Sequence, residues 1–157
     1  MIKIEKMINR QLISPKSIVV VGGSDDTLKP GGNTLKNLLD THYSGDLFVV
    51  NPKADSAQGV KSYRNIGDIP KVECAILAIP AKMCLEAVET LCYKKSCKAI
   101  IILSAGFHED SPEGAEIEKK IAQVCNETGT SLIGPNCIGV MTLDNAGVFT
   151  HPIPRLT

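Results

Sequence analysis

The sequence has no excess charge of either sign. Its 17 lysine and arginine residues are balanced by 17 aspartate and glutamate residues, so the formal net charge is zero at neutral pH. A protein that binds nucleic acid or an anionic membrane through a broad electrostatic field needs a basic excess. We therefore expect no nucleic-acid partner and no membrane partner, and any anionic ligand has to be bound by local groups.

Long apolar runs are also absent. No stretch reaches the roughly 18 apolar residues that are needed to span a bilayer. The first seven residues, MIKIEKM, lack the apolar core of a signal peptide. We expect a cytoplasmic protein.

Closely paired cysteines are missing as well. None of the six cysteines belongs to a C-x-x-C pair, and the three histidines, His42, His108 and His151, share no ligand spacing with them. Most of the cysteines fall in apolar runs, where a reduced thiol packs as a small hydrophobe. We expect core thiols and no metal site.

What is present fits one ordinary globular domain. The chain has 157 residues, of which 43% are hydrophobic and 22% are charged. A chain of this length can bury a core without disulfides or metal. We expect a domain over residues 1–148, followed by a proline-containing linker at 149–157. The linker indicates either a free-standing module with a loose end or one domain of a longer protein.

The segment around the first glycines organises the chain. Residues 17–24 read SIVVVGGS and residues 29–39 read KPGGNTLKNLL. A β-branched run that breaks into glycine and restarts as a helix is typical of a nucleotide-binding βα unit. Gly22 allows a sharp turn, while Gly31 and Gly32 allow a ligand to approach the backbone closely. The N–H groups of the first helical turn would face an anion.

Two features qualify this phosphate-site interpretation. Residues 24–29 lengthen the loop, so its spacing is not the dinucleotide pattern G-x-G-x-x-G. Glycines after an apolar strand also occur in simple turns, and that alternative stays open. The sequence thus predicts an anion site of a kind other than a standard dinucleotide site.

The rest of the chain alternates between strands and helices. We predict strands at 17–21, 47–50, 74–79, 98–103 and 131–133, with a further short strand at 140–142. We predict helices at 1–13, 34–43, 82–95 and from 112 to near 129. Residues 54–71 are turn-rich, with room for a short strand or helical turn. The fold class is α/β, a Rossmann-type doubly wound, mainly parallel sheet in a single domain.

Ligands bind such sheets in the crevice outside the carboxyl ends of the strands. The segments at those ends are 22–32, 51–53, 80–81, 104–109 and 134–139. After the second strand, where a dinucleotide site has an acidic residue for the ribose, this sequence has Lys53. A lysine there suits a ribose phosphate or another anionic group. A solvated turn lysine is the alternative.

Seven segments, in order over nearly the whole chain, resemble the CoA-binding domain of NDP-forming acyl-CoA synthetases. This family includes the succinyl-CoA synthetase alpha subunit and ADP-forming acetyl-CoA synthetases. The matching segments are VVGGS at 20–24, Gly31-Gly32 before the helix, VVNPK at 49–53, Gly59 with Tyr63, IPA at 79–81, SAGF at 104–107 with Glu109, and GPNCIG at 134–139.

The resemblance implies coenzyme A as the ligand and a set of contact residues. CoA phosphates would lie on the glycine-rich loop, with Asn51 and Lys53 towards the adenosine phosphate. Ile79, Pro80 and Ala81 would border the nucleotide and pantetheine, and residues 104–107 with Asn136 would lie towards the thiol. The implied contact residues are Gly22, Ser24, Asp25, Asp26, Gly31, Gly32, Asn51, Lys53, Ile79, Pro80, Ala81, Ser104, Ala105, Gly106 and Asn136. Asp25 and Asp26 depart from what phosphates prefer, so we expect their side chains to point away while their N–H groups contribute.

The resemblance also implies a reaction for the whole protein. These ligases convert an acid, CoA and NTP to acyl-CoA, NDP and phosphate through a phosphohistidine. That histidine lies in a following domain, and an ATP-grasp domain binds the nucleotide. No histidine of this chain lies in a matching context, so we assign no catalytic residue and expect this chain to bind CoA without catalysing by itself. The expected partners are the ligase and ATP-grasp domains or subunit, and a homo-oligomer stays open.

Two other functions remain as alternatives. One is a free-standing regulator that binds CoA or a nucleotide. The other is an NAD(P)-binding domain of a dehydrogenase or redox sensor, against which stand the lengthened loop and Lys53.

Overall fold

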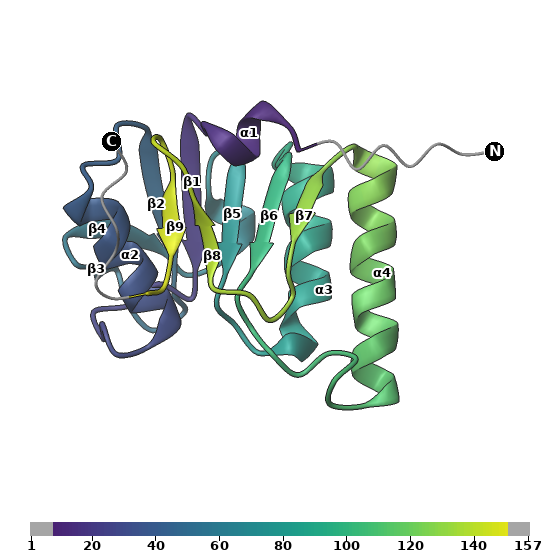
Figure 1. The fold of residues 1–157 in the computed structure, drawn as a ribbon. Helices are drawn as coiled ribbons and strands as arrows, with labels where there is room; N and C mark the ends of the chain where they lie inside the picture. Colours follow the sequence, from purple (N-terminus) through teal and green to yellow (C-terminus); the bar gives the residue numbers. More distant parts are fainter. Residues whose placement is uncertain (1–7, 151–157) are drawn as a thin grey trace.

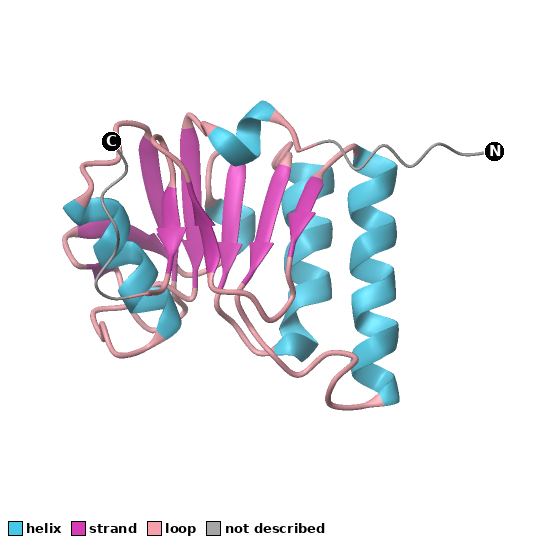
Figure 2. Ribbon diagram, in the orientation of Figure 1, coloured by secondary structure: helices cyan, strands magenta, loops and turns pink. Residues whose placement is uncertain are grey.

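The structure is a computed structural model that describes residues 8–150. The strands are β1 (Ser17–Val21), β2 (Asp46–Val50), β3 (Ser56–Ala57), β4 (Val60–Tyr63), β5 (Cys74–Leu77), β6 (Ala99–Ile102), β7 (Ser131–Ile133), β8 (Gly139–Met141) and β9 (Ala146–Val148). The helices are α1 (Arg10–Ile13), α2 (Pro30–Asp40), α3 (Ala81–Glu89) and α4 (Pro112–Thr128), with a 3₁₀ turn η1 (Ile66–Asp68) and a π-helical turn η2 (Thr90–Lys94). Figure 2 shows the helices, strands and loops in one view.

In the described part of the chain, the main sheet has seven strands in the order β3-β4-β2-β1-β5-β6-β7. All of its pairings are parallel except that of β3 with β4. Counted along the chain, the parallel strands have the order 3-2-1-4-5-6 of the Rossmann fold. The predicted Rossmann-type sheet is therefore confirmed, and its strand order reverses between β1 and β5.

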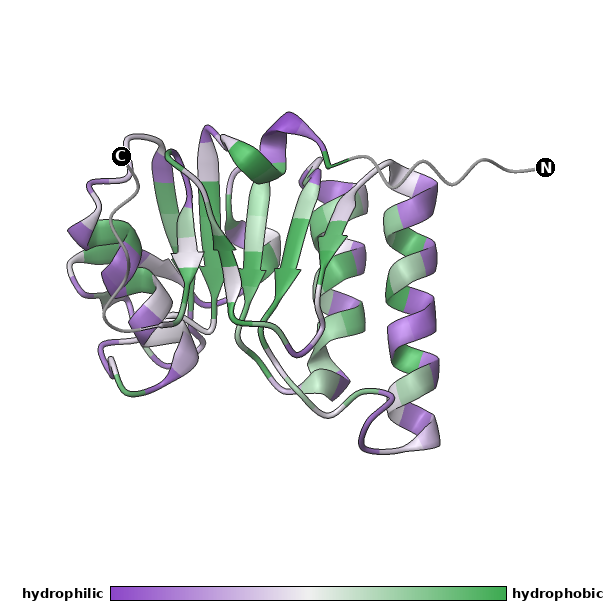
Figure 3. Cartoon of the chain, in the orientation of Figure 1, coloured by the Kyte–Doolittle hydropathy of each residue, from purple (hydrophilic) through white to green (hydrophobic). Residues whose placement is uncertain are grey.

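The central strands β1, β5 and β6 are buried on both faces, which explains their continuous apolar runs. Val19, Val21 and alternate residues of β5 and β6 face α3, η2 and α4. Ile18, Val20 and the intervening residues face α1, α2 and the β8–β9 hairpin. In Figure 1, α3 and α4 lie on one side of the sheet and α2 and the hairpin on the other. Figure 3 shows the strands as the apolar centre, with polar residues along the outer side of α4.

Several predicted boundaries move. The first crossover helix begins at Pro30 instead of residue 34 and ends at Asp40 instead of 43. Proline is favourable in a first helical turn, so the two glycines after it belong to the helix and not to the preceding loop. The helix ends earlier because His42 adopts a positive φ of 56°.

The ends of the chain add further detail. Of the helix predicted at 1–13, the structure describes α1, and residues 1–7 lie outside the described range. The strand predicted at 140–142 is β8, and it pairs antiparallel with β9, which the sequence did not indicate. Phe149 donates its N–H to the Ile138 carbonyl, so the start of the predicted linker lies on the domain. Residues 151–157 lie outside the described range.

Buried asparagines attach this hairpin to the rest of the domain. Asn37 of α2 donates to the carbonyl oxygens of Val148 (2.6 Å) and Thr150 (3.1 Å). Asn145 donates to the Leu12 carbonyl at 3.0 Å.

Among the described residues, none of the helices combines the length and apolar character that crossing a bilayer requires.

Candidate functional site

The turn after β1 lies where the strand order of the sheet reverses. Gly22 has a φ of +93°, and a Cβ on it would collide with the carbonyl oxygen of Ala78 at the end of β5. Its N–H donates to the Val50 carbonyl at 2.8 Å, at the end of β2. Only glycine combines this φ with this close approach. The predicted sharp turn at Gly22 is confirmed.

Gly31 and Gly32 have a packing role that the sequence did not indicate. Both are buried in the first turn of α2. A Cβ on Gly31 would collide with the Gly22 carbonyl, and one on Gly32 would collide with the Asp26 carbonyl. Each of these glycines makes room for the protein's own backbone, and the close approach of a ligand stays a prediction. They let the helix and the glycine-rich loop lie directly against each other.

The N-terminus of α2 has no capping group among the described residues. Lys29 is its N-cap residue and makes no side-chain capping bond, and the first turn contains no acidic side chain. The first N–H groups of a helix have no partner within the helix, and its dipole adds partial positive charge there. This end of α2 is therefore suited to an anion that comes from outside the chain.

The two acidic residues of the loop are engaged by backbone N–H groups. An Asp25 carboxylate oxygen accepts the Gln58 N–H at 2.6 Å, and an Asp26 carboxylate oxygen accepts the Leu28 N–H at 3.0 Å. The Asp26 N–H donates to Ser24 Oγ at 3.2 Å. The carboxylates thus have partners within the protein. The Asp26 N–H is also occupied, so the expected contribution of this group to a ligand would require the Ser24 contact to break.

Gln58, which the sequence did not single out, holds the loop closed. Its Nε2 donates to the carbonyl oxygens of Ser24 and Gly32, both at 2.8 Å. It lies in the β3–β4 turn with a φ of +49°. In the sequence, glutamine followed by glycine at 58–59 indicates a turn. It does not indicate that Gln58 contacts residues about 30 positions earlier in the chain.

The loop after β2 joins the same site. Asn51 Nδ2 donates to the Gly23 carbonyl at 3.0 Å, and Asn51 Oδ1 accepts the Lys53 N–H at 2.9 Å. The side chain of Asn51 is thus occupied in positioning the two loops. Lys53 is exposed.

Hydrogen bonds join the loop after β6 to the loops after β5 and β7. Ser104 Oγ donates to the Ile79 carbonyl at 2.5 Å, and the Asn136 N–H donates to the Ser104 carbonyl at 2.9 Å. A Cβ on Gly106 would lie 3.5 Å from the Ala81 Cβ. Pro80 and Ala105 lie next to these contacts and are both exposed. The structure therefore brings all the predicted site segments to one edge of the sheet.

Part of the β6 loop is already occupied by the protein's own carboxylate. Glu109 Oε1 accepts the N–H groups of Gly106 (2.5 Å) and Phe107 (3.1 Å). A bond from the N–H of Glu109 itself, together with these two, holds the pKa of the Glu109 carboxyl below its usual range. Phe107 is fully buried in the core, so the expectation that it borders the crevice is corrected.

His108 belongs to an ion pair on the outside of this loop. Its Nδ1 lies 2.6 Å from Glu118 Oε2, and this hydrogen bond raises the pKa of the His108 imidazole. The imidazole is largely exposed.

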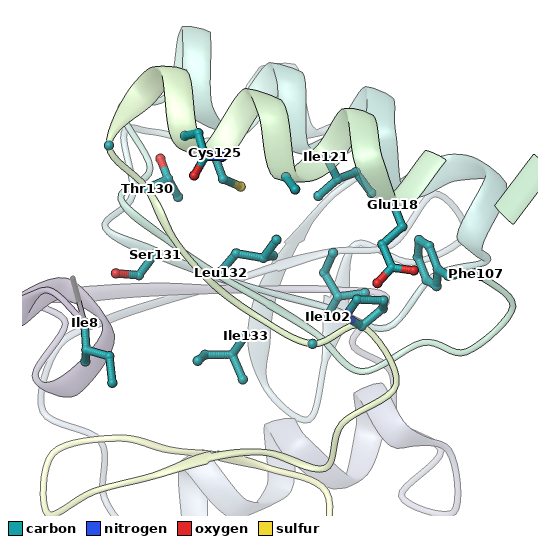
Figure 4. Close-up of a pocket in the computed structure, with 15 residues that line it drawn as sticks. Ile8, Ile102, Phe107, Glu118, Ile121, Cys125, Thr130, Ser131, Leu132 and Ile133 are labelled. Atoms are coloured by element: carbon teal, nitrogen blue, oxygen red, sulfur yellow. The ribbon is translucent and has the colours of Figure 1, made fainter. Parts of the chain in front are cut away.

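A cavity of about 640 Å³ lies between α4 and β7 and reaches this edge at Phe107, Gly134 and Pro135 (Figure 4). Its lining is mostly apolar, with Ile121, Leu132 and Ile133 among the contributors and Glu118 as its charged residue. None of the predicted site residues lines it. A phosphate would meet no cation in this cavity, so we place the candidate anion site at the sheet edge.

Comparison with known proteins identifies relatives of this chain. Residues 16–142 match a family described as a CoA binding domain. The ADP-forming acetate–CoA ligase II of Archaeoglobus fulgidus is 37% identical over 145 residues, which cover 92% of this chain and 21% of the ligase. The alpha subunit of the ADP-forming acetate–CoA ligase II of Pyrococcus furiosus is 36% identical over 129 residues, which cover 82% of this chain and 28% of the subunit.

A solved structure gives the same result. The dinucleotide forming acetyl-coenzyme A synthetase 1 of Ca. Korarchaeum cryptofilum, in complex with phosphate and ADP, aligns with a TM-score of 0.78 at 31% sequence identity. The alignment covers 88% of this chain and 29% of that chain. The present chain thus spans less than a third of the length of each of these three proteins.

Proposed function

This chain belongs to the CoA binding domain family, and from that membership we propose that it binds coenzyme A across the carboxyl edge of its sheet. The CoA phosphates lie on residues 22–32 in this proposal. The observation that carries it is the N-terminus of α2, which has no capping side chain and no acidic residue in its first turn. A diphosphate supplies the negative charge that such a helix end favours.

The adenosine end of CoA lies towards the loop after β2. Lys53 is exposed there, and its backbone is fixed by the Asn51 side chain. An ammonium group at this position suits the 3′-phosphate that distinguishes CoA from its dephosphorylated form. The same lysine replaces the acidic residue that a ribose diol prefers.

The pantetheine arm runs along the loops after β5 and β6. Ile79, Pro80 and Ala81 offer an apolar border on one side, and Ser104, Ala105, Gly106 and Asn136 lie on the other. The hydrogen bonds from Ser104 to Ile79 and from Asn136 to Ser104 support a single continuous surface. The residues of this chain therefore bind and orient the cofactor.

For the whole protein we propose an NDP-forming acyl-CoA ligase, supported by the ADP-forming acetate–CoA ligases among the relatives. CoA supplies the thiol that accepts the acyl group. The phosphohistidine and the ATP-grasp parts belong to other domains or subunits in this proposal. The cytoplasmic location, the homo-oligomer and the linker at 149–157 stay predictions from the sequence.

Calorimetric titration with CoA, 3′-dephospho-CoA and NAD tests the binding proposal. We expect saturable binding of CoA, weaker binding of dephospho-CoA and no heat from NAD. In Lys53→Glu, the affinity for CoA should fall more than that for dephospho-CoA, while Lys119→Glu on the exposed side of α4 should change neither. Binding of NAD in preference to CoA would return the chain to the dehydrogenase alternative. Strong CoA binding without a ligase in the complete protein would favour a free-standing regulator.

A further inference from the structure

The cavity between α4 and β7 has the size and the lining of a small-molecule site. Its volume of about 640 Å³ lies within the range of about 300–1,000 Å³ that is typical of ligand pockets. Figure 4 shows Ile121 on the α4 side of the cavity, with Leu132 and Ile133 on the β7 side. Ile102 and Phe107 add to the apolar wall. Such a lining favours the apolar part of a ligand.

The cavity follows β7 along its length. Thr130 lines it before the strand starts, and Gly134 and Pro135 line it after the strand ends. Five residue steps of about 3.3 Å give this path a length of roughly 16 Å. Gly134 is exposed, so this end of the cavity is open to solvent. A chain of several carbon atoms therefore fits along the strand in an extended form.

This open end meets the part of the sheet edge where the CoA thiol is proposed to lie. Phe107 directly follows Gly106, and Pro135 directly precedes Asn136, both neighbours being residues of the proposed pantetheine surface. The Asn136 N–H, which belongs to the peptide bond with Pro135, donates to the Ser104 carbonyl at 2.9 Å. The mouth of the cavity and the thiol end of the CoA site therefore share the same two loops.

The charges around the cavity restrict the kind of ligand that it accepts. Among the described residues, no lysine, arginine or histidine lines it, whereas Glu118 does. Glu118 Oε2 lies 2.6 Å from His108 Nδ1, but the imidazole is outside the lining. A carboxylate placed in the cavity would lose its hydration and gain no cation from the lining. The cavity therefore favours a neutral, apolar group.

We propose, on the basis of the CoA site proposed above, that this cavity receives the acyl group of an acyl-CoA. The thioester lies at the mouth beside Gly106 and Asn136, and the acyl chain extends along β7 between Leu132 and Ile121. The substrate class is a neutral acyl group of several carbon atoms, either aliphatic or aromatic. An acetyl group reaches only the mouth, and a succinyl group carries the second carboxylate that the lining disfavours.

Titration calorimetry with CoA, acetyl-CoA, octanoyl-CoA and succinyl-CoA tests this proposal on the unmodified chain. We expect octanoyl-CoA to bind at least about 10-fold more tightly than CoA, because its alkyl chain leaves water. Acetyl-CoA should bind about as tightly as CoA, and succinyl-CoA no more tightly than acetyl-CoA. Equal affinities for octanoyl-CoA and CoA, or a preference for succinyl-CoA, would overturn the acyl site and leave the CoA site standing. Binding of none of the four compounds would overturn both proposals.

Ala122 of α4 lines the cavity and offers a position from which to fill it. In Ala122→Phe, the ring occupies the space of the acyl chain, so the gain of octanoyl-CoA over CoA should be lost while the Kd for CoA stays unchanged. Lys120→Phe places the same ring at an exposed position of α4 outside the lining and should keep the gain. Ala122→Glu repeats the test with a carboxylate in case the larger ring prevents folding, and should give the same loss. Retention of the gain in the Ala122 variants, or its equal loss in Lys120→Phe, would contradict the cavity as the acyl site.

Discussion

Helices α2 and α4 both begin at the carboxyl edge of the sheet, but their first turns are completed in different ways. The Ser111 hydroxyl accepts the Gly114 N–H at 3.0 Å at the start of α4, and Glu113 adds negative charge in the first turn. At the start of α2, Lys29 takes the N-cap position without forming a side-chain cap, and the first turn has no acidic residue. The chain thus caps α4 with its own side chain and leaves α2 without a side-chain cap, as the proposed phosphate site requires.

The loops that precede these two helices also differ in whether a carboxylate of the protein binds their N–H groups. The N–H groups of Gly106 and Phe107, before α4, are held by the Glu109 carboxylate. Before α2, Gln58 holds the loop through the Ser24 and Gly32 carbonyl oxygens, so it fixes the loop without placing a negative charge on its N–H groups. A helix N-terminus alone therefore does not identify a phosphate site. Helix α3 also starts without a side-chain cap or an acidic first turn, so α2 is singled out by the glycine-rich loop that precedes it.

The largest effect is expected where the α2 loop contacts the helix backbone. In Gly32→Ala, the new Cβ collides with the Asp26 carbonyl, which belongs to the main chain and cannot rotate away. We expect CoA affinity to fall about 100-fold or more and the melting temperature to fall as well. Titration calorimetry and thermal unfolding measure the two effects. Gly67→Ala is the control, since nothing lies within 4 Å of a Cβ there; equal behaviour of the two variants would remove the close packing from the explanation.

A smaller effect is expected when α2 is given the kind of start that α4 has. In Lys29→Asp, the new carboxylate caps the first turn and should raise the free energy of unfolding by about 1 kcal/mol. The same carboxylate repels the CoA phosphates, so we expect the Kd for CoA to rise about tenfold. The opposite signs of the two changes are the signature of a functional anion site. Lys29→Ala is the control for loss of the lysine charge alone, and unchanged affinity in Lys29→Asp would exclude α2 as the phosphate site.

The next largest effect on CoA affinity is expected when the two hydrogen bonds from Gln58 to the α2 loop are removed. Gln58→Leu loses both hydrogen bonds to the loop and should weaken CoA binding about fivefold, or about 1 kcal/mol. Gln58→Glu should be worse than Leu because a carboxylate would face two carbonyl oxygens. Competition of CoA against a fluorescent CoA analogue can resolve these differences. Gln123→Leu, on the exposed face of α4, should have no effect, and wild-type affinity in Gln58→Glu would show that the two bonds do not support the site.

The cap of α4 should affect stability and not binding. Ser111→Ala removes the acceptor of the Gly114 N–H and should lower the free energy of unfolding by about 1 kcal/mol. Urea unfolding measures this loss, and calorimetry should give an unchanged Kd for CoA. A loss of CoA affinity as large as that of Lys29→Asp would mean that both helix starts bind the ligand.

The sequence predicts the features whose causes lie within a few neighbouring residues, and it misses those that depend on contacts between distant residues. The apolar runs of β1, β5 and β6 and the turn at Gly22 are visible as short patterns, since burial on both faces and a positive φ restrict residue type directly. The sequence predicts the start of α2 four residues too late, because two consecutive glycines do not indicate a helix. Their actual role, contact with the Gly22 and Asp26 carbonyl oxygens, is a property of the folded chain.

Contacts between residues far apart in the chain account for the rest. Gln58 reaches the α2 loop across the sheet edge, and β9 pairs with β8 and accepts a hydrogen bond from Asn37 of α2. None of these pairings leaves a period or motif in the sequence. The resemblance to CoA-binding domains supplied the site segments as a set, but it could not show which of their groups are already occupied by the protein itself.

The smallest effect concerns pH at the α4 side of the comparison. His108 donates to Glu118, with Glu109 Oε2 3.9 Å away, and the hydrogen bond to Glu118 raises the pKa of His108 in the folded state. The pair therefore stabilises the fold fully below the unfolded imidazole pKa of about 6.5, and this contribution is lost as the pH rises through the higher folded value. We expect the melting temperature of the unmodified chain to exceed that of His108→Gln slightly at pH 5.5 and to equal it near pH 9. A difference that grows with rising pH would contradict the pairing, and CoA affinity should not follow this change, because the proposed anion site lies at α2.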